Sequence, residues 1–108
     1  MANAALLVLT QFPGRDGAQR LARRLVELRL AACVTVGTAV ESLYHWRGAI
    51  ETAQEIPVVI KTVADRYPEV EAAIREHHPY ELPEIVAVLL TDGFAPYLDW
   101  IAAETAGR

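Results

Sequence analysis

Two adjacent histidines are the residues of this chain best suited to metal chemistry. Imidazole is available as a ligand near neutral pH and suits Cu(II), Zn(II) or Ni(II), so His77 and His78 predict a metal site. Neighbouring residues of a helix point about 100° apart, but Pro79 pushes the residue before it out of the helical conformation and redirects the backbone. In the alternative interpretation, His77 completes the packed face of a helix and His78 interacts with the dipole at its C-terminal end.

Cys33 is a further candidate ligand, because its thiolate binds soft metal ions. It follows two alanines at the start of an apolar segment, where a small buried thiol serves equally well as a core residue. The sequence contains no set of nucleophile, base and orienting residue, no glycine-rich phosphate loop and no paired-cysteine zinc motif. We therefore expect a protein that is not an enzyme and requires no cofactor.

Length and charge narrow the class of protein. The 108 residues include 14 acidic and 10 basic side chains, and 53% are apolar, which predicts one folded domain over residues 1–108. The acidic balance argues against nucleic acid as a partner. The single cysteine cannot form an intrachain disulfide, and residues 1–5 carry no basic residue of an export signal. The first apolar run is far shorter than the about 18 residues that span a membrane, so we expect a cytoplasmic protein with no membrane partner.

The apolar periodicity divides the chain into seven elements. Strands are predicted over residues 4–12, 32–46, 50–63 and 83–91, and helices over residues 16–28, 65–78 and 94–104. Two strand-helix-strand halves joined by a hairpin are the plan of the ferredoxin-like βαββαβ sandwich, an α/β (α+β) fold. The last helix is an addition to that plan.

Particular residues mark the ends and breaks of these elements. Asp16, followed three residues later by Gln19, resembles a capping box at the start of the first helix. Arg47-Gly48 follows an alternating strand and is typical of a hairpin turn. Pro57 has no N–H to donate, so it predicts a bulge, an edge, or the place where a strand passes from one sheet to another.

The two strands of this hairpin are too long for a chain of this size. At about 3.3 Å per residue the hairpin would reach about 40 Å, whereas a compact chain of this length has a radius of gyration of about 13 Å. We expect its apolar tip to project from its own core and to be covered by another subunit. In the alternative, Gly37 and Pro57 break the hairpin into shorter strands that fold back onto the core. The predicted interface residues are Tyr44, Trp46, Ile50 and, at the border of the apolar stripe of the last helix, Trp100.

Five ordered blocks of the sequence resemble those of the CutA or divalent-cation tolerance proteins, and the match covers nearly the whole chain. One such block would be a weak signal, but five in order are a strong one. The blocks are Leu30-Ala31-Ala32-Cys33-Val34, Ser42-Leu43-Tyr44-His45-Trp46-Arg47-Gly48 with Glu51 and Glu55, Lys61-Thr62, His78-Pro79-Tyr80-Glu81-Leu82-Pro83-Glu84-Ile85, and Gly93 with Tyr97-Leu98-Asp99-Trp100.

The resemblance implies a very stable homotrimer of ferredoxin-like subunits, similar in architecture to the PII signalling proteins. In such a trimer the long hairpins of neighbouring subunits extend one another's sheets. The family is associated with tolerance to copper and other divalent cations, and in some relatives copper contacts the positions of His77 and His78. Some relatives also bind copper through a cysteine at the end of the first strand; the matching residue here is Thr10, which removes a soft ligand.

The likeness to PII-type trimers also implies clefts between subunits that hold a small ligand. The residues expected to converge there are Lys61, Tyr80, Glu81, Glu84 and Trp46. In the alternative, Glu81 and Glu84 flank prolines in a loop and Lys61 pairs with a carboxylate. The predicted function is a homotrimer that binds divalent metal ions such as copper or zinc and takes part in metal tolerance. The second hypothesis is a PII-like signalling or small-ligand-binding trimer with only an indirect link to metals.

Overall fold

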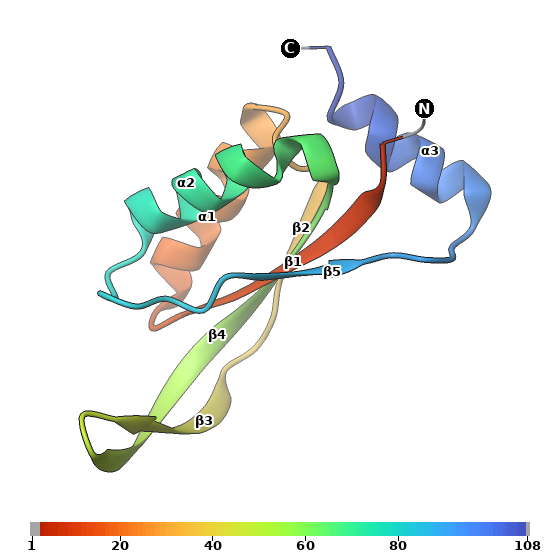
Figure 1. The fold of residues 1–108 in the computed structure, drawn as a ribbon. Helices are drawn as coiled ribbons and strands as arrows, with labels where there is room; N and C mark the ends of the chain where they lie inside the picture. Colours follow the sequence, from red (N-terminus) through yellow and green to blue (C-terminus); the bar gives the residue numbers. More distant parts are fainter. Residues whose placement is uncertain (1–2, 108) are drawn as a thin grey trace.

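The computed structural model describes residues 3–107, which form one antiparallel sheet and three α-helices (Figure 1). Met1 and Ala2 lie outside the described residues, and they belong to residues 1–5, for which no export signal is predicted. The elements in chain order are β1 (Ala5–Phe12), α1 (Arg15–Glu27), β2 (Cys33–Val36), β3 (Val40–Trp46), β4 (Ala49–Val63), the 3₁₀ turn η1 (Ala64–Arg66), α2 (Tyr67–His77), β5 (Val86–Leu89) and α3 (Ala95–Glu104).

The sheet has the topology that the sequence predicts. Its strand order is β2-β4-β1-β5, with every paired strand antiparallel and with β3 paired to the outer part of β4. Because β1 and β2 both run antiparallel to β4, they are parallel to each other, and α1 makes the crossover between them. The fold is therefore ferredoxin-like, and α3 is an additional helix at the end of the sheet away from the β3–β4 hairpin (Figure 1).

The core lies between the sheet and one layer of helices. Alternate residues of β1 are buried, and Val8 and Phe12 join one apolar cluster with α1 and α2. The period of two in the strand and the apolar stripes of the helices place these side chains on facing surfaces. The helices contribute Ala18, Leu21 and Leu25 from α1 and Val70, Ala73 and Ile74 from α2.

The ends of the helices confirm one local prediction and correct another. α2 ends at His77, and His78 before Pro79 is extended (φ −85°, ψ 133°), as predicted. The capping box at Asp16 is wrong. α1 begins at Arg15 with extended Gly14 as its N-cap and with no side-chain cap, so Asp16 lies inside the first turn, where its charge favours the helix dipole instead.

Gly37 and Pro57 break the long hairpin on one side only. The strand predicted over residues 32–46 is two strands, because β2 ends at Val36 and β3 begins at Val40. Residues 37–39 face only two residues of β4, which is a bulge. The Gly37 N–H donates to the Pro57 carbonyl oxygen at 2.9 Å. The backbone N and C=O of one strand residue point to the same side of the strand. The N–H that Pro57 lacks would therefore point toward the bulge at residues 37–39, where β4 has no ladder partner, and β4 continues past Pro57.

The hairpin projects from the core, as the size argument predicts, and the alternative in which it folds back is wrong. We call β3 and residues 49–55 of β4 the arm; it extends away from both core helices (Figure 1). The molecule measures 46 × 26 × 23 Å with a radius of gyration of 14.5 Å. At the tip, Arg47 (φ 50°) and Gly48 (φ 82°) form a two-residue turn with positive φ at both positions, which matches type I′ geometry.

Large apolar side chains are exposed in several parts of the chain, and three places hold two or more of them. These are Leu43 and Ile50 with others on the arm, Val86, Val88 and Leu89 on the edge strand β5, and Phe94, Tyr97 and Trp100 along α3. Such an area on one molecule indicates a surface that another molecule covers.

No helix within residues 3–107 is long and apolar enough to cross a membrane.

Candidate functional site

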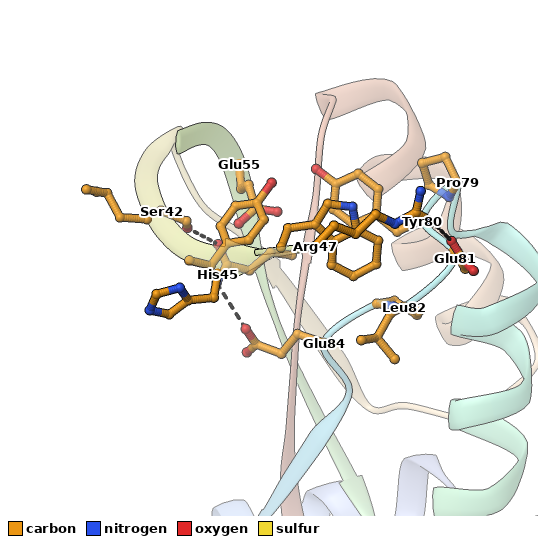
Figure 2. A pocket seen from close by; sticks show the side chains of 14 residues that line it. Ser42, His45, Arg47, Glu55, Pro79, Tyr80, Glu81, Leu82 and Glu84 are labelled. Atoms are coloured by element: carbon orange, nitrogen blue, oxygen red, sulfur yellow. Dashed lines mark hydrogen bonds and ion pairs between the residues drawn. The ribbon is translucent and has the colours of Figure 1, made fainter. Parts of the chain in front are cut away.

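A cleft of about 890 Å³ lies between the arm and the loop formed by residues 79–84. Figure 2 shows Pro79 and Glu81 of this loop on one side, and Ser42 and His45 of the arm on the other. Its size is that of a site for a small molecule. All of its lining residues belong to one chain, and a cleft between subunits stays a prediction.

The register of the arm divides its side chains between two faces. Tyr44 lies opposite Glu51, and Val40 lies opposite Glu55, so residues of even number on β3 share a face with residues of odd number on this part of β4. Tyr44, Trp46 and Glu55 therefore share one face and line the cleft. Ile50, which lies opposite His45, is on the other face of the arm, although His45 itself also borders the cleft.

His78 fixes the loop to the end of β1. Its Nδ1 accepts the backbone N–H of Tyr80 at 3.1 Å, and its Nε2 lies 2.5 Å from the carbonyl oxygen of Gln11. A carbonyl oxygen only accepts, so Nε2 carries the proton and the imidazole is neutral. The ring also packs on Phe12 and Tyr80, with centroids 4.3 and 4.8 Å apart. Buried His78 thus holds Tyr80 over the cleft.

Polar contacts join the arm to the loop at two further points. The Gln11 amide donates to Glu84 Oε1 at 3.2 Å, and the Ser42 hydroxyl donates to Gln11 Oε1 at 3.4 Å. Arg47 reaches across to Glu81 at 3.1 Å (Figure 2), and its guanidinium lies 5.2 Å from the centre of the Trp46 ring. The Arg47–Glu81 ion pair is exposed, so it is worth little by itself, but it brings the tip of the arm to the loop.

The base of the cleft contains a buried carboxylate. Glu55 is only 9% exposed. Burial and then the negative charge of Glu55 raise the pKa of the Tyr80 phenol above its usual value of 10.0. Tyr80 is therefore a neutral hydroxyl near pH 7.

The structure brings together four of the five predicted cleft residues. Trp46, Tyr80, Glu81 and Glu84 all line the cleft. Within one chain Lys61 lies elsewhere, six residues from Glu55 along β4 and about 20 Å away, with its Nζ 2.6 Å from the Thr35 hydroxyl. Its place in a cleft between subunits stays a prediction. The alternative prediction, in which Lys61 pairs with a carboxylate, is wrong within residues 3–107.

Several residues of the cleft were not singled out as site residues by the sequence, and Glu55, Arg47 and Gln11 make its main polar contacts. Glu55 and Arg47 stand in a block of the resemblance, and the alternation of the hairpin with its Arg47-Gly48 turn would have placed Glu55 on the face of Tyr44 and Trp46. Gln11 carries no such signal, because its role depends on contacts with residues far away in the chain.

Comparison with known proteins gives the family. A family model described as CutA1 divalent ion tolerance protein matches residues 6–104. The chain belongs to the CutA1 family. The divalent-cation tolerance protein CutA of Thermus thermophilus is 37% identical over 99 residues, which are 92% of this chain and 96% of the relative. The resemblance predicted from the five sequence blocks is confirmed.

Solved CutA structures share the whole fold. CutA of Xylella fastidiosa has a TM-score of 0.93 at 40% identity, covering 95% of this chain and 99% of that chain. The structure of CutA from Archaeoglobus fulgidus, described as a periplasmic divalent cation tolerance protein, has a TM-score of 0.91 at 32% identity and covers 94% and 99%. The ferredoxin-like, PII-like architecture is thus that of the CutA1 family, whose description names tolerance to ions rather than a reaction.

The predicted metal pair of this CutA1 chain does not converge in the subunit. Pro79 turns His78 toward the end of β1, where protein atoms engage both ring nitrogens. His77 Nδ1 lies 2.9 Å from the carbonyl oxygen of Ala73, so it carries the proton, and a neutral His77 presents its lone pair at Nε2. Within residues 3–107, no three His, Cys, Asp or Glu side chains are placed to hold one ion.

Cys33 lies far from the histidines and outside the helix-covered core. It is paired with Lys61, four residues along β4 from Pro57, whereas His78 contacts Gln11, the partner of Pro57. That offset is about 13 Å along the sheet. The thiol is half-buried, and Lys61 Nζ lies 3.8 Å from its Sγ. The interpretation of Cys33 as a core residue is therefore wrong for the single subunit, since its side chain lies on the face that carries no core helices.

Proposed function

We propose that this protein takes part in tolerance to divalent metal ions such as copper or zinc, as a homotrimer that binds these ions directly and catalyses no reaction. The observation that carries the proposal is the match of the CutA1 divalent ion tolerance model over residues 6–104. The ferredoxin-like subunit with its projecting arm supports the same assignment, because it is the fold of the solved CutA structures.

The donor atoms favour weak binding at His77. Its Nε2 is an intermediate-to-soft ligand suited to Cu(II) or Zn(II). His78 would coordinate an ion only by giving up its contact with Gln11 or Tyr80. Cys33 offers a soft donor elsewhere on the sheet, and an ion held there would have Lys61 as a like-charged neighbour. Separate metal-ligating side chains, rather than one closed site, suit a protein that binds metal ions weakly and releases them again.

Calorimetric titration with Cu(II) tests the metal assignment. We expect His77→Ala to weaken binding and Cys33→Ser to remove any tighter thiolate component. His78→Gln keeps a hydrogen-bonding side chain while removing the imidazole, which separates ligation from loop anchoring. His45→Ala, on the exposed arm, is the matched control and should bind Cu(II) like the unmodified protein. Binding that is unchanged in the His77→Ala/His78→Gln double variant would contradict the assignment.

The trimer is supported by the surfaces that the subunit leaves uncovered. Ile50 is 70% exposed and Leu43 is 66% exposed on one face of the arm. An isolated two-stranded arm with apolar residues is marginally stable in water, so covering it by neighbouring subunits stabilises both strand pairing and association. Trp100, stacked on Tyr97 and 41% exposed, provides a second apolar surface. Tyr44 and Trp46 line the cleft, and their part in the interface stays a prediction.

The cytoplasm remains our proposed location. The single cysteine needs no oxidising compartment, which supports it. The CutA of Archaeoglobus fulgidus is described as periplasmic, which makes cell fractionation the decisive test. Cell fractionation with marker proteins should place it in the cytoplasmic fraction; recovery from the cell envelope would contradict the proposal.

The cleft supports a second candidate function, the binding of a small molecule as in PII-like signalling trimers. The observation that favours it is a volume of about 890 Å³ enclosed by aromatic and charged side chains from two separate segments. In this case the link to metal tolerance is indirect. Variants at His77 would then leave ligand binding unchanged, while variants in the cleft would leave Cu(II) binding unchanged.

A further inference from the structure

Glu55 is a buried carboxylate without a cationic partner among the described residues. It is 9% exposed, and no ion pair of residues 3–107 includes it. The charge of Glu55 acts on the Tyr80 phenol, whose pKa it raises, and a neutral phenol compensates a buried negative charge only in part. Because Glu55 lines the cleft, a positive group entering the cleft would supply the missing counter-charge.

The walls around Glu55 are of the type that attracts organic cations. Tyr44, Trp46 and Tyr80 all line the cleft. The face of an aromatic ring is negative, and a cation within about 6 Å of it is stabilised. The protein already uses one wall in this way, since the Arg47 guanidinium lies 5.2 Å from the centre of the Trp46 ring.

The charges of the cleft exclude anionic ligands. Its lining contains three carboxylates and one guanidinium. Arg47 is already paired with Glu81, and Glu84 receives only the neutral amide of Gln11. The uncompensated charge at Glu55 and Glu84 repels phosphates and carboxylates. Aromatic and apolar surface between these charges favours an organic body over a bare metal ion.

We propose that the cleft binds a small organic ammonium compound, with an ammonium group against Glu55 and its carbon skeleton against the rings of Tyr44, Trp46 and Tyr80. This inference rests on the second candidate function, the binding of a small molecule, and names the chemical class of that molecule. Glu84 is placed to attract a second amino group at the mouth of the cleft. Metal binding through His77 is independent of it.

Calorimetric titration with 1,4-diaminobutane tests the proposal, with the neutral isostere 1,4-butanediol and the anion ATP as comparisons. We expect saturable binding of the diamine at one site per subunit and no binding of the diol or of ATP. Glu55→Gln should weaken diamine binding about 10-fold to 100-fold, the usual effect of a charge-assisted hydrogen bond. Glu41→Gln makes the same change on the other face of the arm and should bind normally.

A second measurement reports from inside the cleft. The chain has two tryptophans, so in a Trp100→Phe background the fluorescence of Trp46 alone is followed. The diamine should change this signal, and Glu55→Gln should remove the change while circular dichroism and sedimentation mass stay the same. This separates a lost ligand contact from a variant that fails to fold or assemble.

Several results would overturn the inference. Equal binding of the diamine by Glu55→Gln, or equal binding of the diol, would show that the charge of Glu55 is not recognised. Binding of ATP in place of the diamine would overturn the cation but retain small-molecule binding. No binding of any of the three would overturn both. No diamine binding together with a lower sedimentation mass of Glu55→Gln would show that a second copy of the chain fills the cleft.

Discussion

At the scale of single residues, Thr10 has a buried hydroxyl that is not satisfied by a hydrogen bond in the described part of the chain. Within the described part of the chain, its Oγ1 is the one buried side-chain oxygen or nitrogen that has no hydrogen-bond partner. Thr10 is 1% exposed between the sheet and the helices. A hydroxyl left unpaired in such a place lowers stability.

We therefore expect Thr10→Val to raise the free energy of unfolding by about 1 kcal/mol, because it keeps the shape and removes the unpaired hydroxyl. Denaturant unfolding at fixed protein concentration measures the effect. Thr62→Val is the matched control, since the buried Thr62 hydroxyl donates to the Leu30 carbonyl oxygen at 2.6 Å. It should lower stability; a loss of stability in both variants would contradict the account of Thr10.

Tyr80 predicts a pH dependence at the alkaline end. Burial and the Glu55 carboxylate raise its pKa in the folded protein above 10.0. The neutral phenol therefore stabilises the fold below pH 10, and this contribution is lost as the pH rises through the higher folded pKa. Burial and Glu71, which accepts a hydrogen bond from the hydroxyl at 2.8 Å, raise the pKa of Tyr67 in the same direction.

Absorbance of tyrosinate during an alkaline titration measures these groups. We expect two tyrosines to ionise later than the free side chain, and Tyr80→Phe to remove one of them. The loss of stability above pH 10 should also be smaller in Tyr80→Phe than in the unmodified protein. An unchanged late phase in this variant would show that Tyr80 is not shielded.

At the scale of elements, the contact between Gly37 and Pro57 determines where the arm begins. A Cβ on Gly37 would lie 2.9 Å from Cγ of Pro57, closer than carbon atoms approach. Gly37→Ala should therefore destabilise the protein by about 1–3 kcal/mol, the range typical of overpacking. A double-mutant cycle with Pro57→Ala checks the cause, because the cost should shrink when the ring is absent. Equal costs in both backgrounds would assign the effect to the backbone instead.

The elements and the topology of the sheet were largely predictable, and some element boundaries were not. Apolar periodicity located β1, β4 and the three helices, because burial on one face leaves a pattern in neighbouring residues. The break after Val36 depends on a contact with Pro57, and the cap of α1 depends on where the chain leaves β1. Sequence periodicity records which face is buried, but not the partner that buries it.

The candidate site, too, was predictable in its residue types but not in all of its contacts. Resemblance supplied Trp46, Tyr80, Glu81 and Glu84, which the fold brings to one cleft. Lys61 was grouped with them although it lies on the same strand as Glu55, where every residue adds about 3.3 Å. His78 was expected to bind metal, yet its exit from the helix directs it to a backbone carbonyl. A histidine whose two ring nitrogens hydrogen-bond to backbone groups can serve to hold the fold together rather than to bind a metal ion.

At the scale of the whole molecule, assembly is the main prediction. Sedimentation equilibrium should report about three times 11.9 kDa for the unmodified protein. Ile50→Glu should shift the mass toward the monomer, because it places a charge on the exposed apolar face of the arm. Ala72→Glu, on the exposed side of α2, is the control and should remain a trimer. A monomer mass for the unmodified protein would refute the trimer.

The uninterrupted β4 has a consequence for local unfolding, which amide hydrogen exchange measures. Its inner residues from Val58 to Lys61 lie between β1 and β2, whereas its outer residues, 49–55, pair with β3 alone. In a dissociated subunit, amide hydrogens should therefore exchange slowly near Ile60 and quickly near Ile50, although both residues belong to the same continuous strand. When subunits associate, that gradient should flatten from the tip inward, so that hydrogen exchange along a single strand records assembly as it happens.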